Sequence, residues 1–211
     1  MFEKIKNFLK IKKKDKSEKT VKQRIDELFD SFNSEVVTIK IGEDIASFAK
    51  DLGTEIWEFR ETLFENTGFI FPPVRILSSV DFQENEYQIL LRDEEIFTGF
   101  SLFNQDDAVK EIVENLEGIY QANIEKFFVN EIMEKYLETM YKKNCCLTWN
   151  LLMAMPVWGI KLILINILQN GKSIKNIVAV FEKICEYATK NRDVCYKADP
   201  YVIADKVCSE L

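Results

Sequence analysis

The sequence contains no histidine among its 211 residues. This absence removes the commonest general base, the commonest zinc ligand and every Ser-His or Cys-His nucleophile pair. The seven glycines are scattered, so no glycine-rich phosphate-binding loop is present. An enzyme that uses a lysine, or a carboxylate pair such as Asp44 and Glu58, is the remaining catalytic alternative, but no spacing in the chain singles one out. We therefore expect a protein that is not an enzyme, with no catalytic residue, cofactor or metal ion.

Cysteines are few, odd in number and without the paired spacing of a zinc site. Cys145 and Cys146 are adjacent, and vicinal cysteines cannot bridge each other without strain. The other three are Cys185, Cys195 and Cys208. Reduced thiols are the simpler interpretation, which predicts a cytoplasmic protein.

The net charge of −7 is unevenly distributed along the chain. Residues 1–20 contain eight lysines against Glu3, Asp15 and Glu18, a balance of +5 that leaves −12 for the rest. An acidic body repels the phosphate backbone, so we expect no nucleic-acid partner.

Residues 1–20 form a basic arm in which apolar residues such as Phe2, Ile5 and Phe8 alternate with lysines. One interpretation is a flexible, solvated leader, because charged terminal segments fray. The other is weak contact with the inner face of a membrane through the lysines. A secretory signal is excluded, because the apolar run is short and interrupted by lysines.

The pattern of residues 21–142 predicts an α+β subdomain. A short helix over residues 21–32 precedes a β-branched strand over residues 35–41. Asp44 is the predicted cap of the next helix, whose apolar residues recur every three or four positions as far as Leu63. Further elements are a strand over residues 74–77, a hairpin over residues 87–99 with a tight acidic turn, and a long helical region from Asp106 or Asp107 with a break or bend at Gly118. This second helical region is expected to cover the same face of the sheet as the first.

The stretch Gly68–Ile76, which we call the hinge, joins helix to strand. Gly68 can adopt the left-handed conformation that ends a helix, and Pro72-Pro73 keep the following backbone extended. Phe69, Ile70 and Phe71 have two interpretations: exposed anchors for a partner, or a plug between helix and sheet. Arg75 is expected to pair with Glu58 or Glu61, or to contact a neighbouring subunit. The partner-binding candidates are therefore Phe69, Ile70, Phe71 and Arg75.

Residues 143–211 predict an all-helical subdomain. The apolar run over residues 151–168 is nearly long enough to span a bilayer, but Pro156, Gly159, Lys161 and Asn166 interrupt it. We expect a short helix, a turn at Pro156 and a buried helix over residues 157–170. Further helices are expected after a Ser173 cap and from Asp199-Pro200 onward.

Two blocks of residues resemble the flagellar and type III secretion export-gate family, called FHIPEP. The first is the hinge, Gly-Phe-Ile-Phe-Pro-Pro-Val-Arg-Ile, followed by Asn-Glu-Tyr-Gln-Ile at residues 85–89. The second is Ile-Leu-Gln-Asn-Gly at residues 167–171 with Ser173-Ile174. The resemblance implies a cytoplasmic scaffold that packs into a ring and contacts export components or further copies of itself.

Relative to that family, we expect the chain to lack the transmembrane block, the inserted second subdomain and the last subdomain. Only six residues separate Gly99 from the helix near Asp106, where the family inserts its second subdomain. Two alternatives to the export-gate scaffold stay open. One is a peripheral membrane-surface protein held by its basic arm, and the other is a repurposed regulatory paralogue.

Overall fold

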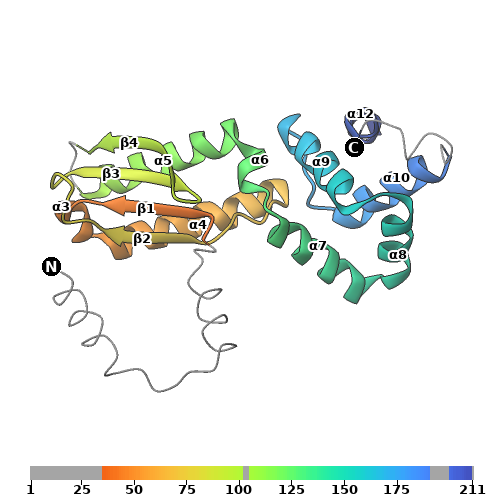
Figure 1. Ribbon diagram of the computed structural model, residues 1–211, viewed down its shortest axis with the longest axis horizontal. Coiled ribbons are helices and arrows are strands. Elements are labelled where there is room, and N and C mark those ends of the chain that lie inside the picture. Colours follow the sequence, from red (N-terminus) through yellow and green to blue (C-terminus); the bar gives the residue numbers. More distant parts are fainter. Residues whose placement is uncertain (1–34, 102–104, 191–199, 211) are drawn as a thin grey trace, which may run out of the picture. The chain divides into compact units, whose positions relative to one another are not determined.

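A four-stranded sheet with helices against it is followed in the chain by further helices (Figure 1). The structure is a computed structural model that describes residues 35–101, 105–190 and 200–210. The predicted α+β class is confirmed. The predicted arm at residues 1–20 and helix at residues 21–32 lie outside the described residues. Residues Glu35–Leu211 form one compact unit with a continuous apolar core, and a subdomain boundary at residues 142 and 143 stays a prediction.

The sheet has the order β2-β1-β3-β4. Its strands are β1 (Val37–Ile41), β2 (Val74–Ser78), β3 (Glu86–Leu91) and β4 (Glu94–Phe100). Strand β1 pairs in parallel with β2 and antiparallel with β3. A parallel pair needs a crossover connection, which the helices between β1 and β2 provide.

The predicted hairpin is confirmed, with Arg92 and Asp93 as its two-residue turn between β3 and β4. Both residues have positive φ angles, 51° and 66°. A two-residue hairpin of type I′ requires positive φ at both central positions, because only then does the turn match the twist of the strands.

The helix predicted between Asp44 and Leu63 is divided in two, α3 (Glu43–Ala46) and α4 (Ala49–Thr67). The expectation of one helix capped by Asp44 was therefore wrong: the cap position is Gly42, and the helix breaks at Ser47 and Phe48. The Ser47 hydroxyl donates to Asp44 O at 2.7 Å, a local bond that competes with helix continuation. Helix α4 ends as predicted at Gly68, whose φ is 76°.

Helices α4 and α5 (Gln105–Ala122) pack against each other on the same side of the sheet, as predicted (Figure 1). Of the break or bend expected at Gly118, the break was wrong, since Gly118 lies inside α5. The chain instead turns around Asn123 and again at Phe128, on either side of α6 (Ile124–Phe127), before α7 (Asn130–Lys143) begins. A single glycine costs a helix only about 1 kcal/mol, which packing readily overrides.

The last helices are α8 (Cys145–Ala154), α9 (Val157–Gln169), α10 (Ile177–Lys190) and α12 (Pro200–Glu210). The predicted separation at Pro156 is confirmed. The cap predicted at Ser173 was wrong: α10 begins at Ile177, and Asn176 Oδ1 accepts from Ala179 N at 3.3 Å. Ser173 Oγ instead accepts from Lys175 N within the preceding loop.

No single helix among the described residues has the length and apolar character needed to cross a bilayer. Helices α8 and α9 meet that test only as a pair, and they are bent by 100° at Pro156. Most of α9 is buried in the protein core, including Ile160, Ile163 and Leu164. The apolar run is therefore explained by packing.

Candidate interaction surfaces

The hinge is held by hydrogen bonds from elements far away in the sequence. The Tyr136 hydroxyl of α7 donates to Gly68 O at 2.5 Å and accepts from Ile70 N at 3.0 Å. Ile174 N, in the loop before α10, donates to Thr67 O at 2.7 Å. Burial raises the pKa of Tyr136, because its charged form would lose hydration. The hinge therefore connects the sheet side of the protein to the helices that follow.

Phe69 and Phe71 are buried in an aromatic cluster beneath the hinge. The Phe69 ring stacks on Tyr120 at 5.2 Å between centroids, and the Phe71 ring lies 5.1 Å from Phe127. These contacts support the interpretation of the two side chains as a plug between helix and sheet. A partner-binding role for either one stays a prediction.

Ile70 and Phe71 line an open groove of about 200 Å³, which we call the hinge groove. Its other walls are α4 residues: Trp57, Arg60, Glu61 and Phe64. Trp57 is 62% exposed and carries the Arg60 guanidinium 5.3 Å above its ring. Arg60 is fixed there because its Nη2 and Nε donate to Phe71 O at 3.1 and 3.3 Å. Trp57 falls outside the spacing of three and four that its apolar helix neighbours Ile56, Phe59 and Leu63 follow, and this spacing is the signal in the sequence that indicates its exposure.

Arg75 lies elsewhere and does not line the hinge groove. It pairs with Glu35 at 3.0 Å, so the pairing expected with Glu58 or Glu61 was wrong. Ile76 points toward α4, where its Cδ1 lies 3.9 Å from a Cβ built on Gly53. Successive side chains of a strand point to opposite faces, so Arg75 points away from α4. A contact between Arg75 and a neighbouring subunit stays a prediction.

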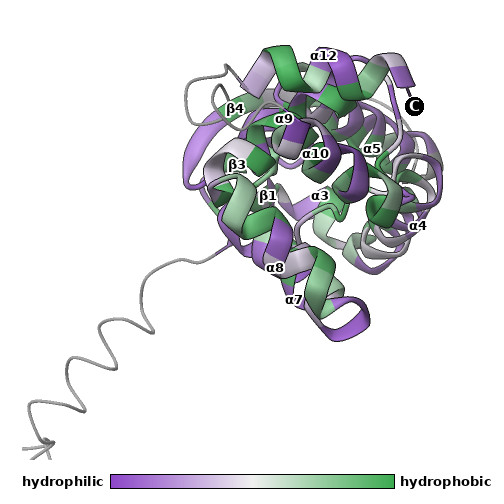
Figure 2. Cartoon of the chain, turned by 90° about the vertical axis from the view of Figure 1, so that its right-hand side faces the viewer, coloured by the Kyte–Doolittle hydropathy of each residue, from purple (hydrophilic) through white to green (hydrophobic). Residues whose placement is uncertain are grey.

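A second exposed apolar surface lies on α8 and the start of α9. In Figure 2, α8 carries green bands between pale and purple ones. Trp149, Met153 and Trp158 are 63%, 65% and 61% exposed. Together with Leu152 and Val157 they make what we call the α8–α9 surface. The opposite side of α8, including Leu147 and Leu151, is buried. Helix α8 is thus apolar on both sides, which is typical of a helix covered by a partner.

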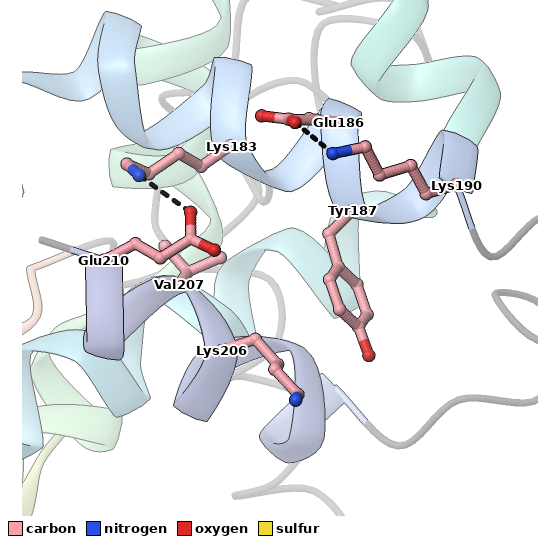
Figure 3. Close-up of a pocket in the computed structure, with 7 residues that line it drawn as sticks. All are labelled: Lys183, Glu186, Tyr187, Lys190, Lys206, Val207 and Glu210. Carbon is pink, nitrogen blue, oxygen red and sulfur yellow. Dashed lines mark hydrogen bonds and ion pairs between the residues drawn. The ribbon is translucent and has the colours of Figure 1, made fainter.

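Figure 3 shows a small pocket lined by residues of α10 and α12. Its volume is about 50 Å³, room for little more than water. Lys183 of α10 pairs with Glu210 of α12 at 2.9 Å, and Glu186 pairs with Lys190 one helical turn later. The Lys183–Glu210 pair links α12 to α10, whereas the Glu186–Lys190 pair lies within α10, and the small volume leaves no space for a substrate.

The other titratable and thiol side chains of the described residues are scattered over the fold. Within residues 35–101, 105–190 and 200–210, no three Cys, Asp or Glu side chains cluster as metal ligands would. Glu58 lines a groove between α4 and α5 in which Asp44 takes no part. Burial raises the pKa of the Cys185 and Cys208 thiols, which opposes the reactive thiolate form. Cys145 and Cys146 are exposed, and Cys195 lies outside the described residues.

Comparison with known proteins gives one family and a set of similar folds. The sequence model of the FHIPEP family matches residues 3–111. No curated protein matches the sequence. Among solved structures, the complex of Chlamydia pneumoniae CdsV and CdsO has a TM-score of 0.70 at 14% identity, covering 83% of this chain and 66% of that one.

Two nonameric assemblies are similar to the same extent. The SctV-C structure from EPEC has a TM-score of 0.69 at 15% identity, with 84% of this chain and 65% of that one covered. The cytosolic domain of EscV from a type III secretion system has a TM-score of 0.68 at 16% identity, with 84% and 64% covered. The chain thus spans slightly less than two thirds of the length of these solved chains, and at such identities the likeness is one of fold.

Proposed function

The chain belongs to the FHIPEP family, and on this premise we propose that it is a non-enzymatic scaffold of a type III protein export gate. It acts on the cytoplasmic side of the membrane and works by binding copies of itself. The nonameric SctV-C and EscV structures, which share its fold, support self-association.

The α8–α9 surface is the observation that carries this proposal. Five large apolar side chains expose an area on the order of 500 Å², comparable to the largest patches on monomers, which are often functional. No charged residue occurs between Asn144 and Ile160. Charge depletion with exposed Trp and Met is typical of the centre of a protein interface.

A ring requires two different patches on each subunit, because a head-to-tail contact joins one surface to another. The hinge groove is the second patch, built by α4 and the hinge rather than by α8 and α9. Its exposed Trp57 and Phe64 and its half-buried Ile70 provide an apolar recess for the α8–α9 surface of a neighbouring copy. This assignment gives Ile70 the partner-facing role expected from the sequence, whereas Phe71 is only 2% exposed and supports the wall of the groove.

The experiment is light scattering coupled to size exclusion over a range of protein concentrations. Wild-type protein should associate beyond a dimer. Trp149→Ser with Trp158→Ser should remove one patch, and Trp57→Ser should remove the other. Each variant alone should be a monomer, whereas an equimolar mixture should form a heterodimer, because each retains the patch that the other lacks.

Val202→Ser serves as the matched control, since Val202 is an exposed apolar residue on α12. It should associate like the wild type. A wild-type chain that stays monomeric at its highest soluble concentration would refute self-association. Variants that show no rescue on mixing would refute the head-to-tail pairing of these two surfaces.

Attachment to an export apparatus is tested separately, by capture of type III secretion components from the native cell. A regulatory paralogue would instead recover the full-length export gate without forming a ring of its own. The peripheral-membrane alternative predicts co-sedimentation with anionic vesicles that is lost on deletion of residues 1–20.

A further inference from the structure

The groove between α4 and α5 differs from the hinge groove in its chemistry. It is open, has a volume of about 330 Å³ and runs between the outer sides of the two helices. Phe59 and Leu63 of α4 and Val113 of α5 form its floor. All three are half-buried and pack against the hydrophobic core. The parts of these side chains that stay exposed are therefore apolar and fixed in position. We call this site the acidic groove.

Carboxylates form the rim of the acidic groove. Glu55 and Glu58 stand on the α4 side and Glu117 on the α5 side. In the part of the chain that the structure describes, no lysine or arginine forms an ion pair with any of them. Glu117 accepts a hydrogen bond from Gln121 Nε2 at 3.1 Å. The rim is therefore a row of like charges that a cationic ligand would neutralise.

The whole helix pair shares this sign of charge. Helix α4 has five carboxylates against Lys50 and Arg60, and α5 has five against Lys110. Such a surface attracts cations at a distance and selects partners by charge. It repels nucleic acid and anionic membranes for the same reason.

We propose that the acidic groove binds a lysine- or arginine-rich amphipathic helix of a partner protein. The apolar stripe of such a helix would pack on Phe59, Leu63 and Val113, and its flanking cations would meet the rim carboxylates. The long stems of lysine and arginine cover apolar surface while their charged ends reach outward. Helix α4, with 19 residues, is about 28 Å long, which accommodates about five turns of a partner helix.

The test uses a labelled peptide of about 18 residues in which leucines form one helical stripe and lysines fill the other positions. Fluorescence anisotropy measures its affinity for the wild-type chain and for the double variant Glu58→Lys with Glu117→Lys. The double variant should bind at least about tenfold more weakly, because two attractive contacts become repulsive. A peptide with glutamates in place of lysines should not bind the wild type.

The matched control is Asp81→Lys with Glu134→Lys, which changes the net charge equally at two exposed positions outside the groove. It should bind the Leu/Lys peptide within about twofold of the wild type. Equal loss in control and groove variants would show attraction to the overall charge only and would overturn the proposal. So would unchanged binding by the groove variant, or failure of the wild type to bind.

This inference does not depend on ring formation. The same titration can be run on the monomeric variant Trp149→Ser with Trp158→Ser. If that variant binds the peptide normally while the wild type proves unable to self-associate, the acidic groove stands and the proposed scaffold function fails.

Discussion

The acidic groove and the α8–α9 surface are both exposed helix surfaces, but they differ sharply in charge. The groove lies between two helices that carry ten carboxylates and three cations between them. The α8–α9 surface lies in a stretch of 17 residues, from Asn144 to Ile160, that has no charge at all. One surface is suited to attract and select a partner by charge, and the other to be covered by packing.

This contrast indicates that the two surfaces serve different partners. An uncharged patch of Trp, Leu and Met gives little orientation at a distance, so it suits association by close packing rather than by charge. A charged groove speeds the capture of a freely diffusing partner of opposite sign. We therefore assign self-association to the α8–α9 surface and capture of a cationic helix to the groove.

The largest effect is expected from a substitution in the hinge, which joins the sheet to the helices that carry the α8–α9 surface. Gly68 has a φ of 76°, and a Cβ there would lie 2.4 Å from Lys175 Cα. Gly68→Ala should lower the free energy of unfolding by about 4 kcal/mol, from left-handed strain and from a clash with backbone that cannot rotate away. Urea denaturation followed by circular dichroism measures the loss. Stability equal to the wild type would show that the contact between the hinge and residue 175 is dispensable.

Alkaline pH should destabilise the protein through buried tyrosines that lie both on the sheet side and at the hinge. Burial raises the pKa of Tyr87, Tyr120 and Tyr136, with the Glu111 charge as a second cause at Tyr87. A raised folded pKa gives stability that is complete below the unfolded value near 10 and is lost as the pH rises above it. Between pH 9 and pH 11 the free energy of unfolding should fall by about 3 kcal/mol.

Tyr120→Phe is the control for this pH dependence, because it removes one titrating group whose hydroxyl has no hydrogen bond within the described residues. The slope of stability against pH should decrease by about one third. An unchanged slope would mean that other groups cause the alkaline unfolding.

Tyr136→Phe should separate the hinge bond from the packing around it. The substitution keeps the ring beside Phe128, at 5.9 Å between centroids, and removes both hydrogen bonds to Gly68 and Ile70. Loss of a buried donor and acceptor pair should cost about 2 kcal/mol of unfolding free energy. If peptide binding at the acidic groove stays normal while self-association weakens, the hinge bond positions only the hinge groove, which sharpens the division between the two surfaces.

A higher salt concentration should weaken peptide binding at the acidic groove but should not weaken self-association. Raising NaCl from about 50 mM to about 500 mM shortens the Debye length and should weaken peptide binding at the acidic groove by about tenfold. Self-association through the α8–α9 surface should stay constant or strengthen slightly, because that surface carries no charge and packs by apolar contact. Anisotropy and light scattering in the same buffers compare the two. Parallel salt dependence would contradict the distinction.

Local chemistry explains how far the fold was predictable from the sequence. Gly68, Pro72-Pro73 and Pro156 have few conformational options, and the boundaries at these residues were predicted correctly. The hairpin was also predicted, from the alternating pattern around Arg92 and Asp93. By contrast, the break predicted at Gly118 and the cap predicted at Ser173 were wrong. The effect of one glycine or serine on helix formation is small, and tertiary packing overrides it.

The surfaces were less predictable than the fold. The sequence placed Ile70 and Phe71 among candidate contact residues, but the groove that they line depends on Trp57 and Phe64 from α4. Periodicity separates the faces of one helix and does not show which neighbour covers each face. The acidic groove was missed for this reason: Glu58 and Glu117 are 59 positions apart and meet only because α4 and α5 pack side by side.

The smallest expected effect concerns Gly118, which lies on α5 with no atom within 4 Å of a built Cβ. Gly118→Ala should raise the free energy of unfolding by about 0.7 kcal/mol, because alanine restricts the unfolded chain and favours helix. Urea denaturation beside Gly68→Ala measures the difference between a glycine required by its φ angle and one that is not. Since Glu117 neighbours Gly118, a stiffer α5 should leave peptide affinity unchanged or slightly higher. A loss of affinity would mean that the groove requires flexibility in α5, and the rigid groove inferred from its half-buried floor would then be wrong.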